Sequence, residues 1–117
     1  MKNYEVSGLT PFVPAMDYEL SSRFYKDLGF TESTRIDQST LFQIPPFGFW
    51  LQDYYVEDWA GNFMMCLYVD DLASWWSRVQ DMTLDANYGE NARVLSPPHD
   101  QEGGYMMQLA DPGHCRP

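Results

Sequence analysis

The sequence predicts a single α+β domain in which a strand–helix–strands unit occurs twice. Each of two helical segments, 17–28 and 72–82, follows an apolar strand-like run and begins just after or at an aspartate. Segments rich in aromatic and β-branched residues follow each helix. One unit alone is too small to bury a sheet face, whereas two units side by side can do so. We therefore expect one domain over residues 1–117, with a first unit at 1–58 and a second at 62–117.

The first helix has the clearest local signals. Leu20, Phe24 and Leu28 recur at a spacing of four, which places them on one helical face. Asp17 is a typical N-cap residue, and Gly29 supplies the left-handed position that ends many helices. In the second helix the corresponding apolar face consists of Leu72, Trp75, Trp76, Val79 and Met82. We expect both tryptophans to pack between helix and sheet rather than to bind a ligand.

The remaining segments alternate strands and turns. The predicted strands are residues 6–14, 31–37, 40–44, 47–55, 63–69, 92–95 and 105–110. Residues 96–104 contain two prolines and two glycines and are predicted to form a loop. Pro11 and Pro14 lack the amide hydrogens that a central strand needs, so the first strand should lie at an edge or leave the sheet early.

Composition excludes several functional classes. The 117 residues carry 17 acidic and 7 basic side chains, for a formal net charge of −10. Nucleic acids and anionic membranes are poor partners for such a surface, because both require basic residues. No apolar run approaches the ~20 residues of a membrane span. Cys66 and Cys115 do not form a CxxC motif, and two thiols are more common in a cytoplasmic protein, which is the expected location.

Three stretches resemble the vicinal oxygen chelate superfamily, which includes glyoxalase I, extradiol dioxygenases and the bleomycin resistance proteins. They are residues 12–30 (FVPAMDYELSSRFYKDLGF), 67–76 (LYVDDLASWW) and 109–113 (LADPG). The aspartate-capped second helix with its aromatic pair is most similar to the bleomycin resistance type. This resemblance implies two βαβββ modules whose curved mixed sheets surround a concave cavity, usually in a homodimer.

The resemblance also implies which positions would hold a metal in the enzymes of the superfamily. They correspond here to Thr10, Gln52, Met64 and a position near Arg116 or Pro117. Only Gln52 offers a suitable oxygen, and one neutral oxygen does not make a metal site. We therefore expect no metal, no other cofactor and no catalytic residue, as in the bleomycin resistance proteins, which bind their drug without transforming it.

If Gln52 faces the cavity, the alternation of side chains along a strand assigns the rest of the lining. Phe49 and Leu51 should then face the core. Phe63, Met65, Leu67, Val69, Met107 and Leu109 should do so as well. The predicted ligand-binding residues are Phe12, Phe42, Trp50, Gln52, Tyr54, Trp59, Met64, Cys66, Tyr68, Met106 and Gln108.

An aromatic, methionine-rich lining suits a small hydrophobic or cationic aromatic ligand. A cation over an aromatic face gains ~0.5–2 kcal/mol, and methionine adapts to irregular shapes. The acidic residues Asp53, Glu57 and Asp58 lie beside the aromatic run and would attract a cation. The favoured function is therefore metal-independent sequestration of such a compound. The same aromatic residues would equally serve simply as core, and the acidic residues as solvated surface.

Two alternatives remain open at this stage. One is a metal-dependent lyase or dioxygenase of the same superfamily with a non-standard site that uses Gln52, Glu102 or His99. The other is an interaction module whose concave face takes a peptide or a partner protein. A final strand beyond residues 111–113, which members of the superfamily generally have, is short or absent here. The resulting sheet edge could be covered by a second copy, and Pro11 and Pro14 mark where a swapped arm could leave the domain.

Overall fold

The computed structural model describes residues 2–56, 58, 63–101 and 104–113. The first half contains β1 (Phe12–Pro14), α1 (Tyr18–Leu28), β2 (Thr31–Ile36), β3 (Ser39–Ile44) and β4 (Phe47–Gln52). The second half contains α3 (Leu72–Met82), α4 (Leu84–Tyr88), β5 (Arg93–Gln101) and β6 (Gly104–Ala110). Among these residues no helix is long and apolar enough to cross a membrane.

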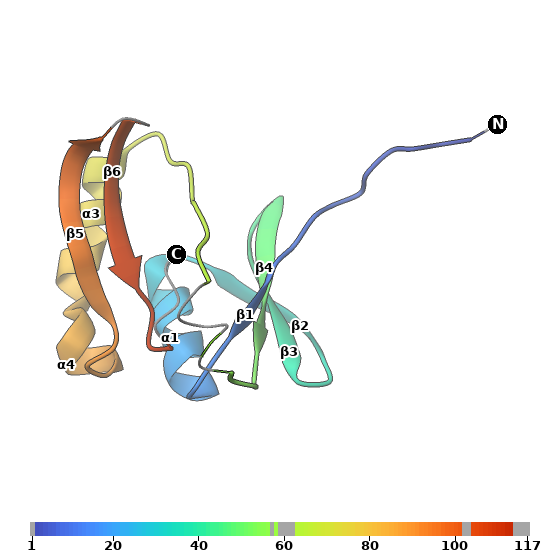
Figure 1. Cartoon of the computed structure of the whole chain (residues 1–117), viewed down its shortest axis with the longest axis horizontal. Coiled ribbons are helices and arrows are strands. Elements are labelled where there is room, and N and C mark those ends of the chain that lie inside the picture. Colours follow the sequence, from blue (N-terminus) through green and yellow to red (C-terminus); the bar gives the residue numbers. More distant parts are fainter. Residues whose placement is uncertain (1, 57, 59–62, 102–103, 114–117) are drawn as a thin grey trace.

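The two halves contribute separate sheets, and α1 lies between them (Figure 1). The first sheet has the order β1-β4-β3-β2, in which β1 is parallel to β4 and the other neighbours are antiparallel. The second sheet is the antiparallel pair β5-β6. The first half thus has the predicted βαβββ order, and the mixed α+β class is confirmed.

The ends of α1 confirm the predicted capping. The Asp17 carboxylate accepts a hydrogen bond from the Leu20 amide at 3.3 Å. Gly29 has a φ of +129°, and its amide donates to the carbonyls of Tyr25 and Lys26. A Cβ at Gly29 would lie 2.6 Å from Arg78 Nη1, so a side chain is disfavoured here by both conformation and space.

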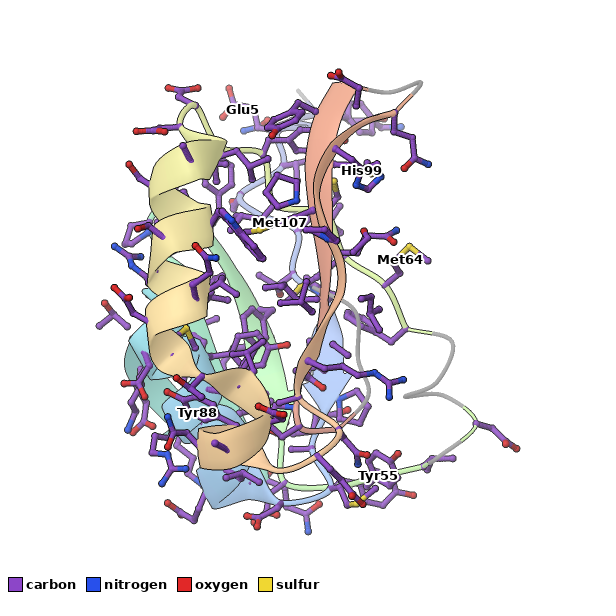
Figure 2. The ribbon with its side chains drawn as sticks, turned by 90° about the vertical axis from the view of Figure 1, so that its left-hand side faces the viewer. Glu5, Tyr55, Met64, Tyr88, His99 and Met107 are labelled. Atoms are coloured by element: carbon purple, nitrogen blue, oxygen red, sulfur yellow. The ribbon has the colours of Figure 1, made fainter. Side chains whose placement is uncertain are left out.

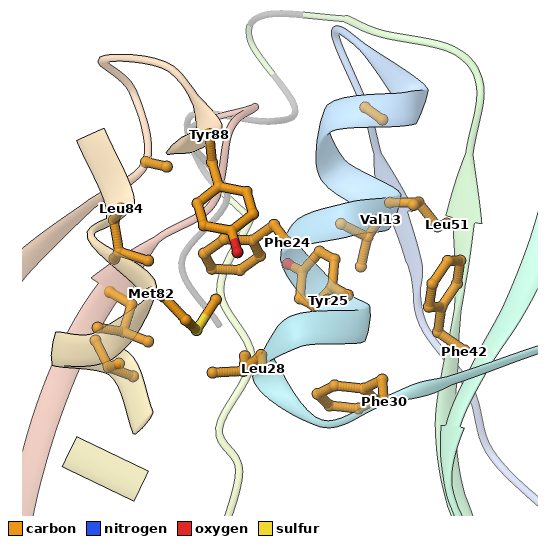
Figure 3. Close-up of a cluster of buried hydrophobic side chains, with 14 of the residues drawn as sticks. Val13, Phe24, Tyr25, Leu28, Phe30, Phe42, Leu51, Met82, Leu84 and Tyr88 are labelled. Atoms are coloured by element: carbon orange, nitrogen blue, oxygen red, sulfur yellow. The ribbon is translucent and has the colours of Figure 1, made fainter. Parts of the chain in front are cut away.

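A single apolar core joins the halves. Tyr88, from α4, packs edge-on against Phe24 of α1 with ring centroids 5.7 Å apart, as Figure 3 shows. The rings of Tyr25 in α1 and Phe49 in β4 also pack together, with their centroids 4.7 Å apart. Val79, Met82, Leu84 and Leu109 of the second half belong to the same buried cluster as α1 and the first sheet. Because such contacts run from one sheet to the other through α1, the halves have a fixed mutual arrangement.

Four sequence predictions about elements are wrong or incomplete. Residues 63–69 are extended but do not form a strand, and residues 96–101, predicted as part of a loop, belong to β5. The predicted strand 6–14 is reduced to β1, and α4 was not predicted. The prolines within β5 lie where its pairing with β6 shifts register between Ser96 and His99, which is a position that tolerates a missing amide hydrogen.

Candidate functional site

An apolar pocket lies between residues 63–69 and strand β6. Its volume is about 420 Å³, which is within the size range of small-molecule sites. The lining residues are Leu28, Phe30, Met64, Met65, Cys66, Leu67, Tyr68, Val69, Leu72, Trp75, Gly104, Tyr105, Met106, Met107, Gln108 and Leu109. No aspartate, glutamate, lysine or arginine is among these lining residues of the described chain, so apolar contact dominates the site.

The pocket has an inner and an outer side. On the inner side, Met65, Met107 and Trp75 pack against the core, and Leu109 is buried within it. On the outer side, Met64, Tyr68 and Tyr105 are largely exposed. In Figure 2, Met107 lies between β6 and α3, whereas Met64 points away from the molecule. The predicted alternation is followed only in part. On β6, Gln108 is exposed and Leu109 is buried, whereas Met106 and Met107 are both half-buried. Tyr105, which shares a face of the strand with Met107 and Leu109, is largely exposed, and so in part is Leu67.

Five sequence-predicted ligand-binding residues line this pocket. Residues 63–69 contribute Met64, Cys66 and Tyr68, and β6 contributes Met106 and Gln108. Cys66 is a free, exposed thiol. Its hydrogen bond to Tyr68, together with the electrostatic effect of the thiol, raises the pKa of the Tyr68 hydroxyl, so this ring is neutral at physiological pH. The outer wall is thus uncharged and combines aromatic, thioether, thiol and amide groups.

Four other predicted residues lie on the first sheet and its edge, outside the lining of this pocket. Phe12 and Trp50 are paired across β1 and β4, and their rings stack at 6.2 Å with an interplanar angle of 16°. Gln52 ends β4, and Tyr54 follows it half-exposed. As predicted, Phe49 and Leu51 face the core, which leaves Trp50 and Gln52 on the opposite face. The predicted site is therefore divided between two surfaces of the chain.

Phe42, a predicted ligand-binding residue, lies in the core and not at a ligand-binding surface. It is 0% exposed and belongs to the buried core. It pairs with Phe49 across β3 and β4, and residues directly opposite each other share a face of the sheet. Phe42 therefore faces the helix side with Phe49 and is excluded from the candidate site. Trp59 and Glu57 lie outside the described residues.

Some lining residues were not in the predicted set. Leu28, Phe30, Leu72 and Trp75 lie on the inner side, and their helical or capping pattern indicated only a core role. Trp75 also carries the Arg78 guanidinium 5.0 Å above its ring, so one face of this indole is already covered by a cation. Tyr105 is an exposed ring at the start of β6, and no sequence signal distinguished it from an ordinary strand residue.

The polar residues considered for chemistry do not line the pocket. His99 is half-buried on β5, where its ring nitrogens lie 2.8 Å from the Pro97 carbonyl and 2.8 Å from the Gln101 side-chain oxygen. These two acceptors raise the pKa of His99. Glu102 lies outside the described residues. Within the described ranges, no group of three His, Cys, Asp or Glu side chains is arranged to hold a metal ion.

Comparisons with known proteins point to one fold. No protein-family model matches the chain. A bleomycin resistance protein from Klebsiella pneumoniae is 26% identical over 107 residues, which cover 88% of this chain and 82% of the relative. The crystal structure of a bleomycin-binding protein complexed with bleomycin superposes with a TM-score of 0.77 at 24% identity, covering 95% of this chain and 94% of that one.

A lactoylglutathione lyase from Agrobacterium tumefaciens superposes with a TM-score of 0.68 at 17% identity, covering 96% of this chain and 91% of that one. A similar fold therefore occurs in a bleomycin-binding protein and in a lactoylglutathione lyase, and the fold alone does not choose between their functions. The chain therefore has the fold of the bleomycin-binding and lactoylglutathione lyase structures, and its sequence resembles that of a bleomycin resistance protein.

Proposed function

We propose that this protein binds and sequesters a hydrophobic, cationic aromatic compound without changing it chemically. The observation that carries the proposal is the apolar pocket between residues 63–69 and β6, whose outer wall includes five residues chosen from the sequence alone. The resemblance to a bleomycin resistance protein supports the same role. The pocket therefore provides a binding surface for which no reaction needs to be assumed.

The outer wall matches the chemistry of such a ligand. Tyr68 and Tyr105 are exposed rings that can stack on a planar group or face a cation, each with a gain of ~0.5–1 kcal/mol at an exposed site. Met64 and Met106 provide flexible, polarisable side chains that follow an irregular outline. Gln108 adds one amide that can orient a polar substituent.

The preference for a cation comes from the charge of the whole chain. The formal net charge is −10, whereas the described pocket lining has no acidic side chain. Asp53, one of the carboxylates expected to attract a cation, lies 3.7 Å from Arg35 in an ion pair. The long-range field therefore concentrates and steers cations, and the aromatic wall makes the contacts. Binding should weaken as salt screens this field.

The side chains at the positions that correspond to metal ligands support binding without a metal. The positions that correspond to metal ligands in the enzymes of the superfamily include Thr10, Gln52 and Met64. A threonine hydroxyl, one amide and a thioether are a poor set for a hard divalent ion or for zinc. We therefore infer that the ligand binds to side chains directly, and that chelation leaves the affinity unchanged.

Calorimetric titration of the chelator-treated protein tests this function. Bleomycin or a planar cationic dye should bind, and a planar anionic dye of similar size should not. Met106→Ala should weaken binding by about tenfold, equivalent to about 1.4 kcal/mol. Met16→Ala is the matched control, because Met16 is an exposed methionine outside the pocket lining. Binding of the anion alone, or binding restored only by a divalent metal, would contradict the proposal.

A further inference from the structure

The position that β4 occupies in the first half has a counterpart in the second half. In the first sheet, β4 lies between β1 and β3, parallel to β1 and antiparallel to β3. In the second half, residues 63–69 precede α3 as β1 precedes α1, and the pair β5-β6 follows as the pair β2-β3 does. Among the described residues no strand lies between 63–69 and β6, and the apolar pocket is found there (Figure 1). We call this space the strand slot.

The backbone of β6 determines how a molecule in the strand slot is held. Within the described sheet β6 pairs with β5 on one of its edges, so every second residue directs its amide and carbonyl toward the slot. A strand edge beside an apolar groove is a template for an added strand. Residues 104–109, which line the slot, span about 20 Å, the length of six extended residues. The slot therefore matches a short extended backbone that runs antiparallel to β6, as β4 runs antiparallel to β3.

The inner side of the strand slot requires apolar side chains at alternate positions. Leu72 and Trp75 of α3 line this side, together with Phe30 from the segment after α1. At the corresponding place in the first half, β4 buries Phe49 and Leu51, which are separated by one residue. Because side chains alternate along an extended chain, an apolar residue at every second position would cover the inner side in the same way.

The outer side of the strand slot favours positive charge. Tyr68 is largely exposed there, and its ring offers a face to a cation. The described lining has no acidic or basic side chain, whereas the whole chain has a formal net charge of −10. Basic side chains between the apolar ones would therefore be attracted by the field of the protein, and acidic ones would be repelled.

We propose that the ligand class of this pocket is a cationic compound with an extended peptide backbone, which pairs with the edge of β6. Its apolar side chains enter the inner side of the strand slot, and its basic side chains lie on the outer side. The inference rests on the proposed function, because it concerns the same pocket, and it adds that the ligand is recognised by its backbone amides. A planar dye without amides makes only the side-chain contacts.

The test uses the full chain and a capped hexapeptide that alternates lysine and valine. Calorimetric titration should show that it binds, and hydrogen exchange should show added protection of amides within residues 105–109. A hexapeptide that alternates glutamate and valine has the same apolar pattern with the opposite charge, and it should not bind.

Methylation of the peptide's backbone nitrogens separates backbone pairing from side-chain contact. One peptide is methylated at its lysines and another at its valines, so each keeps its charge and side chains but loses the donors of one edge. At least one of them should bind more than about tenfold more weakly than the unmethylated peptide, because several backbone hydrogen bonds are lost.

A pair of tyrosine variants tests the place of the basic side chains. Tyr68→Ala removes the ring on the outer side and should weaken binding of the lysine–valine peptide by about two- to fivefold. Tyr4→Ala is the matched control, because Tyr4 is also an exposed ring and does not line the pocket. Equal losses in the two variants would contradict the contact with Tyr68.

Four results would overturn the proposal. In the first, both methylated peptides bind as tightly as the unmethylated one. In the second, the peptide binds without added protection within residues 105–109. In the third, the peptide fails to bind while a planar cationic dye binds, which leaves the proposed function intact. In the fourth, residues 105–109 of the ligand-free protein become protected as its concentration rises, which assigns the slot to a second copy.

The reverse of the third result separates the two proposals in the other direction. If the dye fails to bind while the lysine–valine peptide binds and protects residues 105–109, the aromatic ligand of the proposed function is refuted. Recognition of a peptide backbone by β6 is then confirmed.

Discussion

Single side chains show how far alternation along a strand can be used. The rule correctly separates Phe49 and Leu51, which are buried, from Trp50, which lies on the other face. Phe42 is a predicted ligand-binding residue that lies fully buried in the core instead. The register Phe42–Phe49 places it with the core residues. Register between strands is set by the fold, so residue type alone could not have corrected this assignment.

A buried hydrogen bond connects the first and second halves of the chain. The Tyr25 hydroxyl donates to Asp111 Oδ2 at 2.7 Å, and the Gly113 amide donates to Asp111 Oδ1 at 2.8 Å. Tyr25 and Asp111 are both 0% exposed and are separated by 86 residues in the chain. No sequence pattern indicated this contact, because a contact over such a separation has no local signal.

Removal of the Tyr25 hydroxyl should destabilise the protein. Tyr25→Phe takes one donor from a buried carboxylate and should lower the free energy of unfolding by about 1–3 kcal/mol. Tyr105→Phe removes an exposed hydroxyl and should change it by less than about 0.5 kcal/mol. Urea unfolding followed by tryptophan fluorescence measures both. Equal stabilities for the two variants would show that the Tyr25–Asp111 bond does not hold the halves together.

At the scale of elements, local signals predicted the helices and missed the features that depend on distant partners. Helices α1 and α3 begin after Asp17 and Asp71, as their capping patterns indicate. Residues 63–69 have a strand-like sequence but lie across a pocket from β6, so no ladder forms along them. Residues 96–101 contain two prolines yet form part of β5, because they lie at an irregularity of an edge strand. Whether each of these two segments forms a strand depends on its pairing partner, and a single sequence does not reveal that partner.

The cap of α3 gives a prediction with a defined pH dependence. Ser74 donates to Asp71 from its hydroxyl at 2.6 Å and from its amide at 3.2 Å, and these bonds lower the pKa of Asp71. The stabilisation is therefore present above the ordinary pKa of an aspartate and is lost as the pH falls through the lowered value. Asp71→Ala should reduce stability at pH 7, and the difference from the wild type should shrink in strong acid.

Asp70→Ala is the matched control for this cap, since it removes the same charge from the preceding residue. Urea unfolding at pH 7 and again near pH 2 should show a pH-dependent loss for D71A that D70A lacks. If the two variants behave alike at both pH values, the effect comes from net charge, and the cap contributes nothing specific.

At the scale of the whole molecule, one core fixes two sheets around α1 and leaves an apolar pocket between 63–69 and β6. The fold class and five of the pocket residues could be predicted from the sequence, because alternation and the family resemblance both act through local patterns. The division of the predicted site into two surfaces could not be predicted. It depends on where the first sheet lies relative to β6, and hence on packing between halves.

Methionine-methyl NMR tests the central claim most directly, because methionines lie both inside and outside the pocket. Adding bleomycin or a planar cationic dye to the chelator-treated protein should shift the methyl signals of Met64 and Met106 and leave those of Met16 and Met82 unchanged. Shifts confined to Met16 and Met82, or no shift at saturating ligand, would contradict the assignment of this pocket as the binding site.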